Sequence, residues 1–141
     1  MADRVEYNVK AVHHENVVLR HVIAGSPEIR RLNEATRAGG NGSYQDRLRL
    51  GRLVAEAVRD REARDARMVE EALAPHAGAS RPGPEGSGRV VNVSYLVRRD
   101  EAAGFLAAVD ELRESSPQLD LRVSGPLPPY SFVRTEPAEA A

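Results

Sequence analysis

An apolar stripe with helical spacing constrains this chain more than any other feature. It continues for about 30 residues, between Ser43 and Pro75, on these positions: Tyr44, Leu48, Leu50, Leu53, Val54, Ala57, Val58, Met68, Val69 and Leu73. Ser43-Tyr44-Gln45-Asp46 has the form of a capping box, with Asp in place of the usual Glu or Gln. At about 1.5 Å per residue, the predicted helix over residues 44–74 is roughly 45 Å long. The chain has 141 residues, enough for one domain, so a helix of this length must project from its core.

The middle of this stripe, residues 60–67, contains no large apolar residue. Asp60 with Arg64, and Arg61 with Asp65, stand four residues apart and can form ion pairs on the helix surface. We therefore expect a solvated helical stretch here, stabilised by many small contributions.

The other elements follow from alternation, helical spacing and capping residues. Before the long helix we predict a strand over residues 4–12 and a helix in which Val17 to Ile23 have helical spacing and Gly25 follows the end. A second helix begins at Pro27, with Ser26 as its N-cap, and ends at Gly39-Gly40-Asn41-Gly42. After the long helix we predict a strand over 90–97, a helix capped by Asp100, and a strand over 119–123. This order predicts an α+β fold with a small three-stranded sheet (a ferredoxin-like variant) and covering helices. A sheet this thin leaves edges that can pair with another chain.

Proline, glycine and serine dominate residues 75–88, which we interpret as a linker. We expect a single domain over residues 1–133 and a disordered tail over 134–141.

Composition excludes several classes of function. The 20 basic residues against 21 acidic ones argue against nucleic-acid binding by bulk charge and against a polybasic membrane anchor. The absence of cysteine excludes disulfides, thiolate metal sites and a cysteine nucleophile. No run approaches the ~20 apolar residues of a membrane span, and the amino terminus does not have the form of a signal peptide. We therefore expect a cytoplasmic protein.

The search for catalytic, cofactor and metal sites finds none. His13, His14 and His21 lie close in sequence, but their spacing does not match a metal-binding helix, and we interpret them as a polar cap at a helix start. An alternative stays open, in which the chain is a small-molecule-binding or enzymatic α+β domain. That alternative predicts a closed pocket near Glu6, His13 and Tyr95.

The carboxyl end holds three prolines and two aromatic residues within residues 125–132. Proline fixes φ and removes backbone donors, so we expect this segment to run extended, near polyproline II, with both aromatic rings on one side. It either docks on the core as a strap or offers a contact surface to a protein partner. The candidate contact residues are Pro126, Pro128, Pro129, Tyr130 and Phe132.

This last block, Gly-Pro-Leu-Pro-Pro-Tyr-Ser-Phe-Val at 125–133, resembles the carboxyl-terminal motif of the gas vesicle GvpL/GvpF family. Four earlier blocks are similar to that family in the same order: Val5 to Lys10, Pro27 to Leu32, Leu50 to Val54 and Val93 to Val97. Together the five blocks cover about residues 4–133, which makes the resemblance specific.

The resemblance implies a cytoplasmic, gas vesicle-associated accessory protein without catalytic activity. Members of the family bind the hydrophobic shell protein GvpA, and other accessory proteins, around nucleation of the vesicle. The resemblance also implies an amino-terminal ferredoxin-like domain followed by an α/β domain with long helices. Here the match begins within a few residues of Met1, so the amino-terminal domain is expected to be missing. The sequence leaves open whether the chain acts alone or as a homo-oligomer formed through its long helix.

Overall fold

The computed structural model describes residues 3–38, 44–84 and 89–132. Four antiparallel strands form one sheet in the order β2-β3-β1-β4. Their bounds are Arg4–His13 (β1), Ala79–Pro82 (β2), Arg89–Arg98 (β3) and Leu119–Leu127 (β4). β1 pairs with β3 on one side and with β4 on the other, and its alternate apolar residues, from Val5 to Ala11, are all buried against the core. The predicted α+β class and small sheet are confirmed, but the prediction of three strands is wrong.

The additional strand, β2, lies inside the predicted linker. Its residues Ala79–Pro82 pair antiparallel with β3, from Ala79 opposite Leu96 to Pro82 opposite Val93. All four β2 residues are exposed, so no hydrophobic alternation marks the strand in the sequence. A short edge strand that ends in proline is typical of an edge protected from further pairing.

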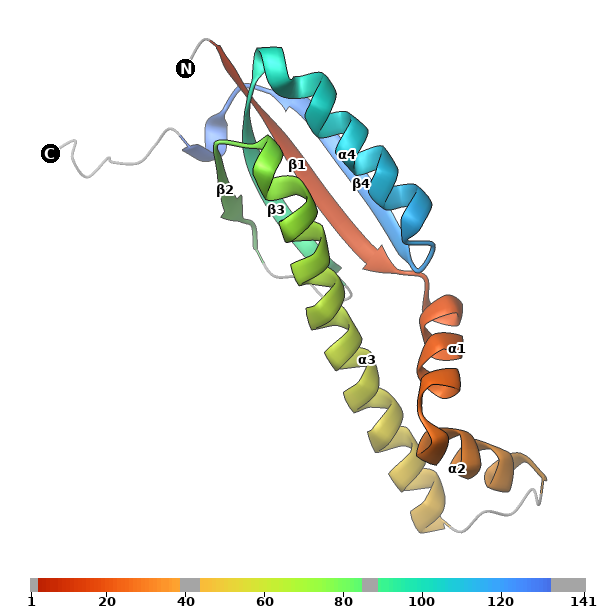
Figure 1. Cartoon of the computed structure of the whole chain (residues 1–141). Helices are drawn as coiled ribbons and strands as arrows, with labels where there is room; N and C mark the ends of the chain where they lie inside the picture. Colours follow the sequence, from red (N-terminus) through yellow and green to blue (C-terminus); the bar gives the residue numbers. More distant parts are fainter. Residues whose placement is uncertain (1–2, 39–43, 85–88, 133–141) are drawn as a thin grey trace, which may run out of the picture.

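Two helices cover one face of the sheet (Figure 1). They are the carboxyl-terminal half of α3 (Tyr44–Leu73) and α4 (Ala102–Ser115). Phe105 of α4 is fully buried and stacks on Tyr7, with 5.2 Å between the ring centroids. On the other face the described residues place no α-helix, only the short 3-10 helix Tyr130–Phe132.

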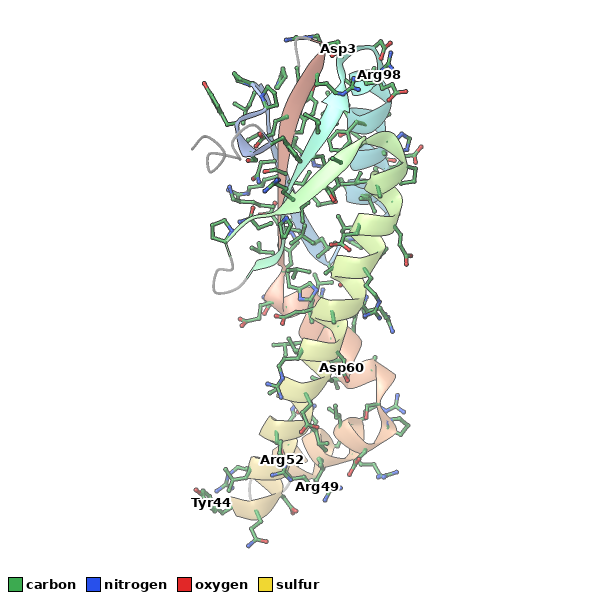
Figure 2. All side chains as sticks on the ribbon, turned by 90° about the vertical axis from the view of Figure 1, so that its left-hand side faces the viewer. Asp3, Tyr44, Arg49, Arg52, Asp60 and Arg98 are labelled. Atoms are coloured by element: carbon green, nitrogen blue, oxygen red, sulfur yellow. The ribbon has the colours of Figure 1, made fainter. Side chains whose placement is uncertain are left out.

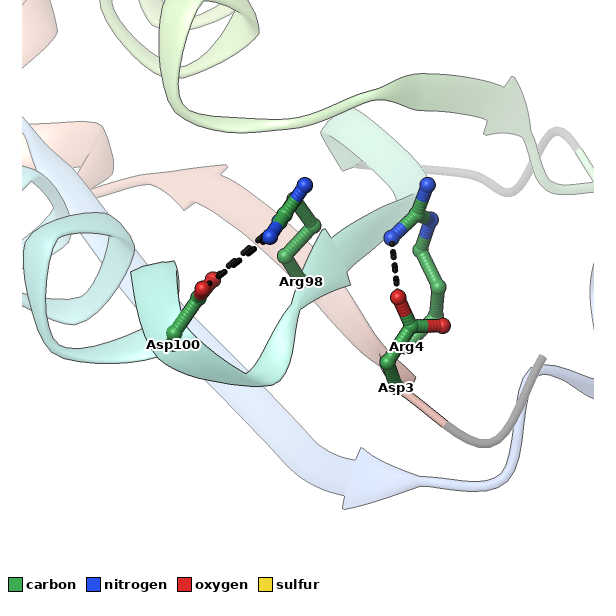
Figure 3. Close-up of polar contacts among 4 residues, drawn as sticks. All are labelled: Asp3, Arg4, Arg98 and Asp100. Atoms are coloured by element: carbon green, nitrogen blue, oxygen red, sulfur yellow. Dashed lines mark hydrogen bonds and ion pairs between the residues drawn. The ribbon is translucent and has the colours of Figure 1, made fainter.

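The predicted N-cap of α4 is wrong. A short 3-10 helix, Arg99–Glu101, precedes α4, and Asp100 makes no cap hydrogen bond. Instead, both carboxylate oxygens of Asp100 accept hydrogen bonds from Arg98, at 3.2 and 3.1 Å (Figure 3). The Arg98 guanidinium lowers the pKa of Asp100 below its ordinary value. The neighbouring pair Asp3–Arg4 lies at the same end of the sheet.

The long helix projects from the sheet as predicted, and it begins at Tyr44 and ends at Leu73. Its amino-terminal half packs against α1 (Glu15–Gly25) and α2 (Pro27–Ala38), and we call these three elements the helical arm. A second apolar core, centred on Val18, Val22 and Ile29, holds the arm together. The predicted cap of α2 is confirmed, since the Ile29 N–H donates to Ser26 Oγ at 3.2 Å. Figure 2 shows Tyr44 at the far end of the arm; Ser43 and residues 39–42 lie outside the described residues.

The middle of α3 departs from the predicted solvated stretch. Asp65 is only 3% exposed and accepts hydrogen bonds from His13, at 2.9 Å, and Gln118, at 3.2 Å. The predicted Arg61–Asp65 ion pair is present at 3.4 Å. The described ion pairs do not include Asp60 with Arg64. Asp65 therefore joins α3 to the end of β1 and to the residue before β4.

Within the described residues, no helix is long and apolar enough to cross a membrane.

Candidate functional site

The candidate site lies on the face of the sheet opposite α3 and α4, which we call the outer face. On β1 the residues that alternate with the core positions are Glu6, Asn8 and Lys10, so their side chains share this face. Pairing places Asn8 opposite Ser94 of β3, which in turn is opposite Arg81 of β2. Polar groups from three strands are thereby collected into adjacent rows.

The carboxyl-terminal segment is anchored on this face by Glu6. The Ser131 backbone N–H donates to Glu6 Oε1 at 2.9 Å, and the Ser131 hydroxyl donates to Glu6 Oε2 at 2.8 Å. Glu6 is only 4% exposed, so the carboxylate is held in a largely dehydrated position. Hydrogen bonds to an ionised acceptor are the strong ones, and this pair fixes a segment 125 residues away in sequence.

A bulge in β4 turns the chain toward this anchor. Glu6 pairs with Leu127 and Asn8 with Ser124, so two residues of β4 stand opposite Tyr7 alone. One of them, Gly125, has φ +130°, a conformation that other residues rarely adopt. A Cβ at this position would lie 2.7 Å from the Glu6 carbonyl oxygen. Glycine is therefore required where the segment crosses β1.

The five candidate contact residues do not lie in one extended polyproline stretch, so that prediction is wrong. β4 continues to Leu127 and includes Pro126, and a 3-10 helix spans Tyr130–Phe132. The two aromatic rings also differ: Tyr130 is 74% exposed, whereas Phe132 is half-buried with the Arg81 guanidinium 5.8 Å from its ring centroid. Pro126 and Pro128 are exposed and Pro129 is half-buried. Their role as partner contacts stays a prediction.

Beside the anchored segment the outer face is hollowed into a groove of about 570 Å³. Its lining includes Glu6, Asn8, Lys10, Arg81, Asn92 and Ser131. The alternative of a small-molecule-binding or enzymatic domain requires a closed pocket near Glu6, His13 and Tyr95, but of these three residues only Glu6 lines the groove. The three residues therefore do not line one pocket, and the structure does not support an active site built from all of them.

Tyr95 points to the opposite face, where it packs on Phe105 with 5.4 Å between ring centroids. Burial, with a smaller contribution from the Glu70 carboxylate, raises the pKa of Tyr95 to about 12. Its hydroxyl has no hydrogen-bond partner among the described residues. Tyr95 is thus a core residue.

The three neighbouring histidines have separate positions. His13, at the end of β1, forms a hydrogen bond with Asp65 of α3, and His21 Nδ1 lies 3.3 Å from Arg61 Nη2. His14 occupies the N-cap position of α1 but makes no side-chain cap hydrogen bond, so only its place at the helix start is as predicted. In the parts of the chain that the structure describes, no three acidic or histidine side chains are grouped to hold a metal ion.

The comparisons with known proteins agree with this architecture. The family model for the gas vesicle synthesis protein GvpL/GvpF matches residues 1–134. The chain belongs to this family. It is 54% identical to gas vesicle protein F of Streptomyces sp. (strain CB03234) over 131 residues. This match covers 93% of this chain and 55% of that protein. Over a shorter stretch of 44 residues it is 46% identical to gas vesicle protein F2 of Halobacterium salinarum, covering 31% of this chain and 20% of that one.

Solved structures of family members share the fold. The crystal structure of GvpF from Anabaena sp. PCC7120 superposes with a TM-score of 0.76 at 18% identity, covering 96% of this chain and 56% of that one. GvpF from Microcystis aeruginosa gives a TM-score of 0.65 at 18% identity, covering 95% and 56%. This chain therefore spans about half the length of the Streptomyces relative and of both solved structures.

Proposed function

We propose that this GvpL/GvpF-family chain is an accessory protein of gas vesicle assembly that binds the shell protein GvpA, and other accessory proteins, around nucleation. Membership of the family supports an accessory role in forming gas vesicles. The proposed role is binding without catalysis.

One observation carries the choice of binding surface: apolar side chains are exposed on a segment that is itself anchored. Glu6 holds Ser131, while the adjacent Tyr130 is 74% exposed. Leu127, where β4 ends, is 37% exposed. An apolar surface that is already fixed loses little conformational entropy on binding, which favours association with a hydrophobic partner.

A capture assay with purified shell protein tests this surface. Tyr130→Ser is expected to weaken capture about tenfold or more, since a central tyrosine of an interface contributes strongly to binding. Tyr44→Ser is the matched control, because Tyr44 is 68% exposed at the far end of the arm. Leu127→Ser and Leu106→Ser form a second pair, both 37% exposed, with Leu106 on α4.

The proposal predicts loss of capture for the two variants in the carboxyl-terminal segment and normal capture for the two controls. Unchanged capture by the Tyr130→Ser and Leu127→Ser variants contradicts it. Loss with Tyr44→Ser alone places the contact on the helical arm instead.

A further inference from the structure

One side of the long helix carries an apolar stripe that the described fold leaves exposed. Tyr44 is 68% exposed and Leu48 is 52% exposed, and the exposed residues Gly51 and Ala55 continue the stripe along α3. Spacings of four, three and four residues place all four on one face of the helix. The helix packs on the second core with residues of its other side, among them Leu50, Leu53 and Ala57. We call residues 44, 48, 51 and 55 the arm stripe.

Gly51 leaves the middle of the arm stripe open. The backbone here is helical, and a Cβ at this position would meet no atom within 4 Å, so neither a turn nor a close contact within the described fold accounts for the glycine. Glycine is also unfavourable inside a helix. With only the Ala55 methyl group on the next turn, a second helix can approach the backbone of α3 closely. A lipid surface, in contrast, is bound by bulky apolar side chains, so the arm stripe fits a helix better than a membrane.

Two charged residues on one side of the arm stripe have no partner. Arg52 and Glu56 are exposed, and neither forms an ion pair or side-chain hydrogen bond with a residue that the structure describes. Within one helix, a basic residue four positions before an acidic one is the less favourable order for pairing. Residues 39–43, which lead into α3, contain no charged side chain, and Figure 2 shows Arg52 toward the far end of the arm, away from the sheet. Both charges are therefore available to a partner.

We propose that the arm stripe pairs with the same stripe of a second copy of this chain, with the two α3 helices antiparallel about a twofold axis near Val54. In a twofold interface, a contact from one residue to another occurs twice, once in each direction. Arg52 of each copy then faces Glu56 of the other, which gives two equal ion pairs beside the stripe. A second copy is favoured as the occupant because one helix supplies both members of these pairs.

The other exposed residues of α3 are compatible with this arrangement. Tyr44 comes to lie near the exposed Ala63 of the other copy. Arg59 comes to lie near Arg49 of the other copy, whose charge is already paired with Glu28. The ring of Tyr44 therefore gains an apolar contact, and the two arginines are not left as a bare pair of like charges.

The position of the sheet decides the direction of pairing. α3 packs on the core of the sheet from Ala66 onward. An antiparallel pair centred near Val54 therefore places each sheet beyond the tip of the other copy's arm. A parallel pair instead brings the two sheets side by side and sets Arg52 against Arg52.

Sedimentation equilibrium of the full chain tests for the dimer. We expect a reversible change from 15.4 kDa to twice that mass as the concentration rises. Gly51→Leu fills the arm stripe and is expected to raise the Kd of the dimer about tenfold or more, whereas the monomer stays folded because leucine is the better helix former. Arg20→Glu is the control, since it changes an exposed charge on α1 away from the stripe, and it is expected to dimerise normally.

A charge exchange between two variants identifies the facing residues. Arg52→Glu alone and Glu56→Arg alone each set like charges against one another twice, so each is expected to raise the Kd about tenfold or more. When the two variants are mixed in equal amounts, each contact joins a carboxylate to a guanidinium, and the mixture is expected to dimerise about as well as the unsubstituted chain. Pairing within one helix cannot produce this recovery, because neither variant has opposite charges at these two positions.

Three results overturn the proposal. They are a mass of 15.4 kDa at every concentration up to about 1 mM, a dimer whose Kd is unchanged by Gly51→Leu and by both charge variants, and a mixture of the charge variants that dimerises no better than either alone. The first result leaves the arm stripe to a different protein, and the second places the dimer contact elsewhere on the chain. Only the purified chain is used, so failure here is separate from failure of the shell-protein assay.

Discussion

The anchor between Glu6 and Ser131 allows a quantitative prediction. Glu6→Gln keeps the size of the side chain but replaces one carboxylate oxygen by an NH₂ group. The charge-assisted bond from the Ser131 hydroxyl is thereby lost, and a neutral bond from the NH₂ group to Ser131 Oγ is the most that can replace it. The other bond, from the Ser131 N–H at 2.9 Å, remains but loses its ionised acceptor. A hydrogen bond to a charged group contributes about 1.5–3 kcal/mol, so anchoring is expected to weaken by about 2 kcal/mol. The detached state of the segment then becomes about 30-fold more populated.

Amide hydrogen exchange measures this change directly. We expect the Ser131 amide to exchange about 30-fold faster in the Glu6→Gln variant, because exchange here follows local opening. The Val9 amide, in the fully buried centre of β1, is expected to exchange as before. Glu15→Gln removes an exposed carboxylate at the start of α1 and serves as the control.

Exchange at Ser131 within about twofold of the unsubstituted chain refutes the reasoning, since the anchor then contributes less than about 0.5 kcal/mol. Equal acceleration at Val9 also refutes it, because Glu6 then supports the whole sheet and has no particular effect on the segment.

Two further predictions concern stability in urea. Below pH 10, Tyr95→Phe is expected to leave the free energy of unfolding unchanged or to raise it by about 1 kcal/mol, since the buried hydroxyl has no partner among the described residues. Because the pKa of Tyr95 is raised to about 12, the unfolded chain loses this proton first, and stability should fall between pH 10 and 12 by on the order of 2 kcal/mol, a fall that the variant lacks. Asp65→Ala should cost about 3 kcal/mol because it leaves His13 and Gln118 unpaired, whereas exposed Asp60→Ala should cost under about 0.5 kcal/mol. A flat pH profile, or equal effects of the two aspartates, contradicts these assignments.

The sequence predicts the elements that carry their own periodic signal. The alternation in residues 4–12 and the stripe over 44–74 both correspond to observed elements within a residue or so of their predicted ends. β2 has no such signal, because all of its side chains are exposed and its stability comes from backbone pairing with β3. Composition alone makes it look like a linker.

Site residues are harder to predict because their partners are distant in sequence. The alternation in residues 4–12 puts Glu6 on the face opposite Val5 and Tyr7, but nothing local indicates that Ser131 lies over it. Asp65 is similar: its pair with Arg61 follows from helical spacing, while its burial depends on His13, which is 52 residues away. For both Glu6 and Asp65, the tertiary fold brings a partner from a distant part of the sequence to the carboxylate, and this partner sets its role.

The pairing of β1 has a consequence for the order in which this protein folds. β1 is made first but lies at the centre of the sheet, and its register joins Arg4 to Arg98 and His13 to Leu119. During synthesis β1 therefore cannot pair until most of the chain has been made, whereas the apolar core of the helical arm is complete once residue 58 has been made. Contacts between distant residues form slowly, so helix formation in the arm precedes closure of the sheet. A newly made chain accordingly passes through a stage in which an unpaired, apolar strand is exposed next to an already folded helical unit.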